Sequence, residues 1–554
     1  MKVAIVASEF PFSGKVPMVP PILEYLGALT LREAPGTELR LHDANQRPVD
    51  PATLDADLIG ISVWTATAPW AYRFADACRA AGKKVVLGGI HATALPDEAA
   101  RHADAVVVGE AESVWGEVLR DARAGRLKPR YQGVQRPLEG LVQSLDARLK
   151  GNYQFRAFFT MRGCPYACSF CSVHEFYGRT IRYRPIGEVA DEIEARAGRI
   201  WFNGDDNIWG ADPDRAVALF DALAGGSRKS WYGFGDLRSV QGAQGERLLA
   251  SARRSGLASV WCGWESGEAS SLASYGATGK QGRNRVEAVK RMQGHGLEVV
   301  LFQVLGGREE GLDSFRRALE LADRLRVNLH PVLLTPLPGT RCHEELRPHL
   351  LPGLGWESYT GVRALFHHPD PACTPAAREQ AYHQLCHDLY RPRRMMQRLT
   401  AIPRAGFPGV RLISLMQQLP MKYALGKARE AWLAEQQQAL PPAPVAAAPP
   451  EGRLAAGLAW LRAAAAGAWL TATAGAEALA HHLDDGLLEA SGLLSDLHDS
   501  AHDVGWGSLA VMALTTALGM AVKKRRSALT EGPTLVAAGA VLLGLAAQVA
   551  LTAG

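Results

Sequence analysis

Three cysteines lie within eight residues of one another, at Cys164, Cys168 and Cys171, in a chain of 554 residues that contains eight cysteines. Cysteines this sparse do not build a disulfide scaffold, and a tight group of three is typical of a metal or redox site in a reducing compartment. A structural zinc site usually takes four ligands, and His174 stands alone as a fourth candidate. Three thiolates suit a four-iron cluster with one iron left open; a zinc or oxygen-sensing site is the alternative.

The cysteines come directly after an apolar run that opens a long strand–helix series. Amphipathic stretches such as 186–197 and 314–325 separate six apolar runs over about 180 residues, which predicts a partial or full (β/α) barrel at 150–345. In such barrels the chemistry takes place at the carboxyl ends of the strands. The expected strands are 157–161, 199–202, 231–234, 259–263, 298–305 and 331–334.

Residues 1–135 form an earlier strand–helix series with short β-branched runs. This alternation predicts an α/β fold, a doubly wound, Rossmann-like parallel sheet covered by helices on both faces. Glycines follow several of the runs, and ligands bind such sheets outside the carboxyl ends of the strands, where small residues let them approach the backbone. The expected strands are 2–7, 39–42, 58–63, 84–87 and 105–108.

The cysteine segment, Arg162-Gly-Cys-Pro-Tyr-Ala-Cys-Ser-Phe-Cys-Ser172, resembles the cluster motif of radical S-adenosylmethionine (SAM) enzymes. That motif reads Cys-x3-Cys-x-aromatic-Cys, and Phe170 stands at the aromatic position. The resemblance implies that the three cysteines hold a [4Fe–4S] cluster whose open iron chelates SAM. One electron from the cluster then cleaves SAM to a 5′-deoxyadenosyl radical, which abstracts hydrogen from an unactivated carbon.

The segment from Trp201 to Ile208 resembles the family's SAM amine motif. The resemblance implies that Gly204, Asp205 and Asp206 lie near the methionyl amino group of SAM. Adjacent carboxylates at a strand end can accept hydrogen bonds from a cationic amine, which supports that assignment. A turn with a helix N-cap is the plainer alternative.

Two later segments also match the family in order along the chain. Residues 260–266 resemble the motif of the fourth barrel strand, which implies that Gly263 and Glu265 lie near the SAM nucleoside. Arg238 follows the third strand and is expected to bind the SAM carboxylate. The resemblance as a whole covers residues 155–345 and predicts a radical SAM barrel.

Residues 85–93 and 105–112 resemble the cobalamin-binding domain that precedes the barrel in one large subclass of this family. A generic nucleotide-binding sheet is the alternative. The Asp-x-His-x-x-Gly motif, whose histidine coordinates cobalt in many cobalamin proteins, is absent, so we expect no histidine ligand on the lower face of cobalt. The resemblance implies that five residues line the corrin and its nucleotide tail: Gly88, Gly89, His91, Gly109 and Glu110.

The last part of the chain differs in composition. After a helical extension at 346–435, a Pro/Ala linker at 436–450 leads to an Ala-rich tail at 451–554. No lysine or arginine stands between Arg462 and Lys523, and the uncharged runs are long enough to cross the ~30 Å hydrocarbon core. We expect cytoplasmic catalytic domains anchored to the cell membrane; a looser membrane association and a soluble helical bundle are the alternatives. The candidate transmembrane helices are 463–480, 504–522 and 532–554.

A radical SAM enzyme with cobalamin resembles the C-methyltransferases of this subclass. We therefore expect methylation of an unactivated carbon in a hydrophobic lipid, polyprenoid or tetrapyrrole, with a flavodoxin or ferredoxin as electron donor. A cyclase or oxidoreductase of the anaerobic Mg-protoporphyrin ester cyclase type is one alternative, and a non-catalytic iron–sulfur sensor is another. The net charge of +5, from 61 basic and 56 acidic residues, is too small to favour nucleic acid as a partner.

Overall fold

The computed structural model describes residues 1–439, except 12–17, 142–148, 150, 152, 154, 197, 199, 210, 228, 282–283 and 403–407. The three candidate transmembrane helices at 463–480, 504–522 and 532–554 lie outside the described residues. Within the described ranges, no helix is both long enough and apolar enough to cross a membrane.

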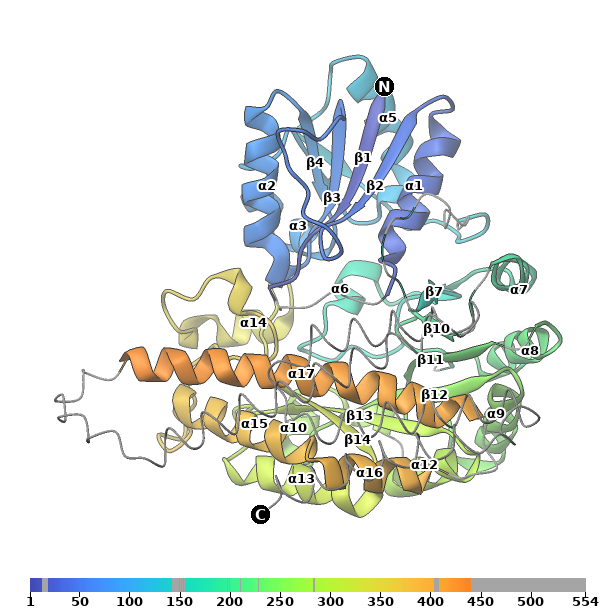
Figure 1. The fold of residues 1–554 in the computed structure, drawn as a ribbon, viewed down its shortest axis with the longest axis vertical. Coiled ribbons are helices and arrows are strands. Elements are labelled where there is room, and N and C mark those ends of the chain that lie inside the picture. Colours follow the sequence, from blue (N-terminus) through green and yellow to red (C-terminus); the bar gives the residue numbers. More distant parts are fainter. Residues whose placement is uncertain are drawn as a thin grey trace, which may run out of the picture. The chain divides into compact units, whose positions relative to one another are not determined.

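The N-terminal sheet contains six parallel strands in the order β2-β1-β3-β4-β5-β6 (Figure 1). The five strands expected from the sequence are all present, and the order is that of a doubly wound fold. The sixth strand is three residues long, too short for hydrophobic periodicity to reveal it. The strands are β1 (Lys2–Ala7), β2 (Glu38–Asp43), β3 (Leu58–Ser62), β4 (Lys84–Gly88), β5 (Ala105–Val108) and β6 (Arg130–Gln132).

Helices cover both faces of this sheet because successive strand residues point to opposite sides. Val3 and Ile5 of β1 pack on one face with α1 (Pro21–Glu33) and α5 (Trp115–Arg123). Ala4 and Val6 pack on the other face with three further helices. These are α2 (Ala68–Ala80), α3 (Ile90–Ala94) and α4 (Pro96–Ala99).

The second sheet contains six parallel strands in the order β14-β13-β12-β11-β10-β7, the partial barrel that the sequence predicts. The expected strand at 157–161 is divided, because the backbone N–H groups of Thr160 and Met161 donate to Asp205 instead of to a neighbouring strand. Its second piece, β8 (Met161–Arg162), pairs antiparallel with β9 (Arg182–Tyr183). The barrel strands are β7 (Arg156–Phe158), β10 (Ile200–Asn203), β11 (Ser230–Gly235), β12 (Leu257–Glu265), β13 (Glu298–Leu305) and β14 (Asn328–Leu333).

Helices follow the barrel strands and form its outer layer. The amphipathic stretches predicted at 186–197 and 314–325 correspond to α7 and α13. The outer apolar core contains residues of the strands and of the helices that follow them, and extends along the chain from Phe158 to Leu425. The helices are α6 (Val173–Tyr177), α7 (Ile186–Ala195), α8 (Pro213–Ala224), α9 (Gly242–Arg254), α10 (Ala269–Ser274), α11 (Thr278–Gln281), α12 (Arg285–Gly294) and α13 (Asp313–Leu325).

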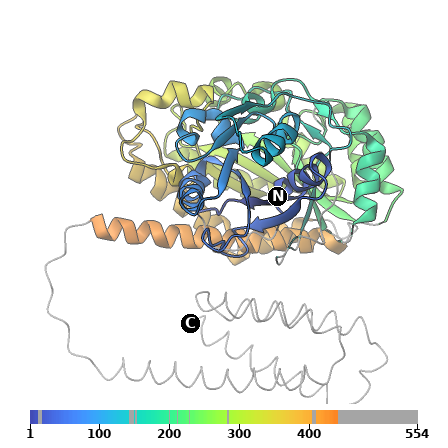
Figure 2. The same ribbon diagram turned by 90° about the horizontal axis from the view of Figure 1, so that it is seen from above.

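The extension after the barrel is helical, as expected, and ends in the long helix α17 (Pro408–Ala439), which Figures 1 and 2 show beside the barrel. Val410 and Ile413 of α17 are fully buried against residues at the amino ends of the barrel strands, including Ala258. The helix therefore covers the end of the barrel opposite the expected chemistry. It also runs four residues into the segment expected as a linker at 436–450. The other helices are α14 (Arg341–Leu346), α15 (Pro375–Leu389) and α16 (Pro392–Ala401).

Candidate active site

The three cysteines lie on the loop between β8 and α6, at the carboxyl end of the first barrel strand. Gly163 opens this loop with φ +96°, and a Cβ there would lie 3.0 Å from the carbonyl oxygen of Thr180. Glycine is therefore needed for the chain to turn into the cysteine segment. The backbone N–H of Cys171 donates to the carbonyl of Cys168 at 3.0 Å, which places two of the three thiols on one tight turn.

An apolar cluster seats this loop against the barrel. Cys168 is buried with side chains from α10, β13 and α14, and the Phe170 ring contacts Tyr275 edge-on at 5.4 Å. The backbone of Ser169 donates to the Tyr275 carbonyl at 2.8 Å and accepts from the N–H of Cys342 at 2.9 Å. The loop is thus held on both sides by backbone hydrogen bonds.

The donor set of this loop fits an iron–sulfur cluster, because three thiols are the soft ligands that iron–sulfur chemistry uses. Among the described residues, no three His, Cys, Asp or Glu side chains converge closely enough to enclose a metal ion. The loop therefore supplies the expected ligands without showing a closed coordination sphere.

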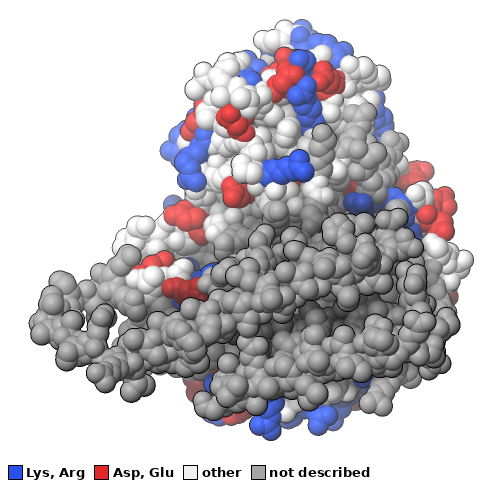
Figure 3. All heavy atoms as spheres, in the orientation of Figure 1, with Lys and Arg blue, Asp and Glu red and all other residues white. Residues whose placement is uncertain are grey.

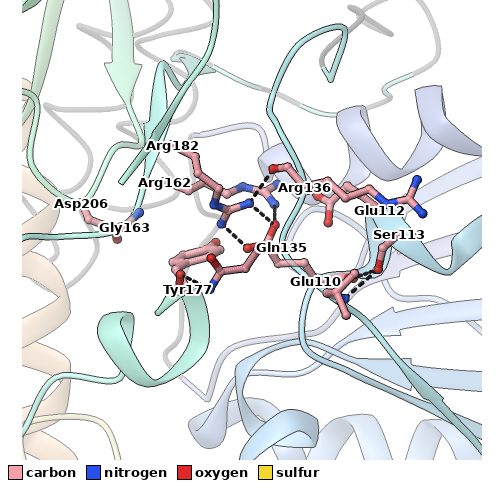
Figure 4. Close-up of polar contacts among 11 residues, drawn as sticks. Glu110, Glu112, Ser113, Gln135, Arg136, Arg162, Gly163, Tyr177, Arg182 and Asp206 are labelled. Carbon is pink, nitrogen blue, oxygen red and sulfur yellow. Dashed lines mark hydrogen bonds and ion pairs between the residues drawn. The ribbon is translucent and has the colours of Figure 1, made fainter. Parts of the chain in front are cut away.

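Asp206 joins the SAM amine segment to the cysteine loop. Its carboxylate accepts a hydrogen bond from the N–H of Gly163 at 3.2 Å, beside Cys164 (Figure 4). Burial raises the pKa of Asp206 to about 6; the adjacent Asp205 also raises it, whereas the Gly163 hydrogen bond lowers it. Gly204 is exposed next to these carboxyls and donates its N–H to the Phe158 carbonyl at 2.7 Å.

Glu265 ends β12 with an unusual backbone conformation. Its φ of +60° lies in the left-handed region, which non-glycine residues seldom adopt, and the pairing with β13 shifts between Gly263 and Glu265. Arg285 clamps this bulge, because its guanidinium lies 3.9 Å from the Trp264 ring centre and donates to the carbonyls of Trp264 and Ser266 at 3.1 and 2.7 Å. Strain of this kind is concentrated at ligand sites.

Arg238, the expected carboxylate ligand, is exposed on the loop after β11 and donates to the Gly279 carbonyl at 3.4 Å. The loop itself is held by the buried Asp236. This carboxylate accepts from the Asn207 side chain at 2.8 Å and from the Ser239 N–H at 2.7 Å. Arg238 therefore lies on a well-anchored loop at the carboxyl edge of the barrel.

The carboxyl edge of the N-terminal sheet is built around two glycines with positive φ. A Cβ at Gly89 would lie 2.9 Å from both the nitrogen and the oxygen of Val63, and a Cβ at Gly109 would lie 2.8 Å from the Gly133 oxygen. The neighbouring Gly88 ends β4 and meets no such contact. Close backbone packing, which side chains would prevent, shapes this edge.

His91 and Glu110, two further residues expected at the corrin, are buried in contacts with the chain itself. His91 is fully buried, lies 3.4 Å from Glu98 and packs edge-on against Trp356. The Glu110 carboxylate binds two arginines that lie in the barrel half of the chain.

An aromatic row lines the inner face of the barrel. Trp261 lies in the middle, with ring centres 5.2 Å from Phe234 and 5.5 Å from Phe302. Phe302 in turn lies 4.6 Å from His330, whose pKa burial lowers to about 4. The row presents neutral, apolar surface.

Comparisons with known proteins agree with both halves of this arrangement. Residues 20–119 match the B12 binding domain family. Over 325 residues, the chain is 29% identical to bacteriochlorophyllide d C-12(1)-methyltransferase of Chlorobaculum tepidum, covering 56% of this chain and 70% of the relative. It is 28% identical to bacteriochlorophyllide d C-8(2)-methyltransferase of the same organism, covering 61% of this chain and 79% of the relative. The chain belongs to the cobalamin-binding radical SAM enzymes.

A solved radical SAM methyltransferase from Kitasatospora setae has the same fold, with a TM-score of 0.57 at 15% identity, over 78% of this chain and 99% of that one.

Two residues of the present chain lie near the predicted sites but were not indicated by any sequence motif. Trp64 follows β3 at the carboxyl edge and is 55% exposed, although Thr67 fixes its backbone through two hydrogen bonds of 3.1 Å. Arg162 is buried beside the cysteine loop. The position of Trp64 directly after a predicted strand was a signal that could have indicated it. No sequence signal indicated Arg162.

Proposed function

We propose that this enzyme methylates an unactivated carbon of a hydrophobic substrate, using a [4Fe–4S] cluster, SAM and cobalamin. The observation that carries the proposal is the hydrogen bond from Gly163 to Asp206. It joins the segment that resembles the SAM amine motif to the loop that bears the cysteines. An amine bound at Asp206 would therefore lie beside the cluster that has to cleave SAM.

Each part of the site has a role in this proposal. Cys164, Cys168 and Cys171 hold the cluster, and Asp206 accepts hydrogen bonds from the amino group of SAM. Glu265, at the strained end of β12, would contact the nucleoside. When bound, the cofactors supply reductive cleavage of SAM and a transferable methyl group, while the chain positions them and excludes water.

At the carboxyl edge of the N-terminal sheet, Trp64 is the surface we assign to the corrin. An indole is a large, rigid apolar group, so one that is 55% exposed leaves a broad apolar face for a ligand. Its backbone is fixed because Thr67, which caps the turn, also hydrogen bonds the Ser8 hydroxyl at 2.7 Å. The backbone that carries the indole is thus fixed, and the exposed ring can pack on a flat apolar group.

The aromatic row supports a planar, apolar substrate. Trp261, Phe302 and their neighbours offer ring faces, and His330 stays uncharged at neutral pH because burial lowers its pKa. The two similar methyltransferases are named for bacteriochlorophyllides, so we favour a tetrapyrrole over a lipid or polyprenoid. The electron would come from a small reduced carrier such as flavodoxin or ferredoxin.

Anaerobic reconstitution tests the proposal. Wild-type protein supplied with iron, sulfide, SAM and reductant should form 5′-deoxyadenosine, and Cys168→Ala should not. Cys342→Ala is the matched control, since this thiol is buried in the same apolar cluster but is outside the motif. Absence of 5′-deoxyadenosine from the wild-type reaction would favour the alternative of a non-catalytic iron–sulfur sensor. With substrate, a gain of one methyl group supports transfer, and a gain of oxygen with loss of hydrogen would support a cyclase.

A further inference from the structure

Two arginines face each other across the short ribbon that leads into the cysteine loop. Arg162 of β8 is paired directly with Arg182 of β9 in the antiparallel register. Their side chains are only 7% and 12% exposed. Like charges directly opposite one another destabilise a ribbon, and burial without counter-charges makes the cost larger.

The counter-charges come from the loop after β5 of the N-terminal sheet. Glu110 accepts from Arg162 at 2.8 Å and from Arg182 at 3.0 Å, and Glu112 accepts from Arg162 at 2.6 Å (Figure 4). A second contact joins Arg182 to the other oxygen of Glu110. Two buried cations are therefore neutralised by two buried carboxylates that lie far away in the sequence.

Aromatic rings complete the setting of this clamp, by which we mean Arg162, Arg182, Glu110 and Glu112. The Arg162 guanidinium lies 5.3 to 5.5 Å from the ring centres of Tyr25, Phe159 and Tyr177. Low polarity around a charge strengthens its ion pairs and raises the cost of losing one partner.

The two ends of the clamp are attached to the two predicted cofactor sites. Glu110 follows Gly109, whose positive φ turns the chain at the carboxyl edge of the N-terminal sheet. Arg162 precedes Gly163, the residue that opens the cysteine loop and donates to Asp206. Movement of the loop at 109–112 would therefore be transmitted to the cysteine loop through the Arg162 side chain.

We propose that Glu110 and Glu112 are positioning residues that hold the cysteine loop in place according to the state of the cobalamin site. A corrin bound at the carboxyl edge fixes the loop at 109–112. The two carboxylates then keep the β8–β9 ribbon neutral and ordered, and with it the segment that starts the cluster motif. This coupling rests on the proposed function, since it requires that the sheet binds cobalamin.

Hydrogen exchange on the full chain tests the coupling, with saturating hydroxocobalamin as the probe. In the wild type we expect cobalamin to slow exchange of residues 160–184 by about tenfold or more. Glu110→Gln should abolish that change, because a neutral amide leaves both arginines undercompensated. Glu117→Gln is the matched control, since Glu117 pairs with Lys128 inside the N-terminal part of the chain and should leave the change intact.

A double variant separates coupling from folding. Glu110→Leu with Arg182→Met removes a buried pair together, which proteins often tolerate. We expect this variant to fold and to bind hydroxocobalamin without protecting residues 160–184. Equal protection in the double variant and the wild type would overturn the coupling, as would a wild type that binds cobalamin without protecting this segment. A wild type that binds no hydroxocobalamin would overturn the proposed function itself.

Discussion

Asp205 accepts two hydrogen bonds from Thr160, one from the backbone N–H at 2.6 Å and one from the hydroxyl at 2.5 Å. The same carboxylate also accepts from the Met161 N–H at 3.0 Å and the Asn203 side chain at 3.1 Å. Four donors occupy both of its oxygens. Of the two adjacent carboxylates in the SAM amine segment, Asp205 therefore holds the start of the cysteine segment in shape, whereas Asp206 carries the bonding capacity that we assign to SAM.

Asn substitutions at these two positions should have different effects. Asp205→Asn places an amide donor against the Asn203 or Thr160 donors, so we expect a loss of about 1–3 kcal/mol in the free energy of unfolding. Asp206→Asn should leave stability within about 0.5 kcal/mol but weaken SAM binding about tenfold or more, because a charge-assisted hydrogen bond is lost. Urea unfolding and SAM titration measure the two effects. Equal loss of stability in both variants would contradict this division.

The sequence could predict what depends on local pattern. The five longer strands of the first sheet and the six of the barrel were found because most of them are short segments rich in apolar residues. The cysteine loop was found because its ligands lie within eight residues. The role of Asp205 was not predictable, because its donors at Thr160 and Met161 lie about 45 residues away and compete with the strand that the apolar run at 157–161 suggested.

Glu265 offers a test of strain against binding. Glu265→Gly relieves the positive φ, whose cost is of order 1 kcal/mol or more, so the variant should be at least as stable as the wild type. It removes the side chain that we assign to the nucleoside, so SAM affinity should fall. Glu265→Ala keeps the strain and should be less stable than the glycine variant. A glycine variant that binds SAM as well as the wild type would exclude this residue from the site.

Trp64 can be tested by substitution, with urea unfolding and hydroxocobalamin titration as the two measurements. Because the side chain is 55% exposed, Trp64→Ala should change the free energy of unfolding by no more than about 0.5 kcal/mol. Hydroxocobalamin should bind the variant about tenfold or more weakly, since the indole face is lost. Tyr423→Ala, at an exposed aromatic residue of α17, is the control and should bind as the wild type does. Unchanged affinity in Trp64→Ala would show that the corrin lies elsewhere.

Glu298 predicts a pH dependence of stability. It is buried at the start of β13, and burial raises its pKa to about 7, although hydrogen bonds with Ser414 and Ser259 oppose the shift. The folded state thus holds the Glu298 proton more tightly than the unfolded state does. The stabilisation that this proton contributes to the free energy of unfolding is present at low pH and is lost as the pH rises from about 4.5 to about 7.

Glu298→Gln should remove that dependence. Relative to the wild type, the variant should gain up to about 3 kcal/mol in the free energy of unfolding between pH 5 and pH 8. Urea denaturation at both pH values measures the gain. Glu320→Gln, at an exposed residue of α13, serves as the control and should show none. A difference between wild type and Glu298→Gln that stays constant with pH would contradict the raised pKa.

Interactions between distant segments account for the rest of what the sequence did not indicate. Glu110 was expected at the corrin, yet its carboxylate binds Arg162 and Arg182, which are 52 and 72 residues away. No periodicity or motif links these positions, and burial of four charges becomes favourable only when all of them meet. The same holds for β6, whose three residues form a strand because β5 lies beside them.

Gly133 lies so close to the backbone of Glu110 that a Cβ at position 133 would be 2.1 Å from the backbone carbonyl oxygen of Glu110. A side chain at position 133 would displace the backbone of Glu110, and with it the loop at 109–112, from Arg162 and Arg182. Gly133 itself belongs to no cofactor motif. A genetic selection for inactive enzyme should therefore return substitutions at Gly133 beside those at the cysteines. The positions intolerant to mutation in this chain extend beyond the residues that touch its cofactors.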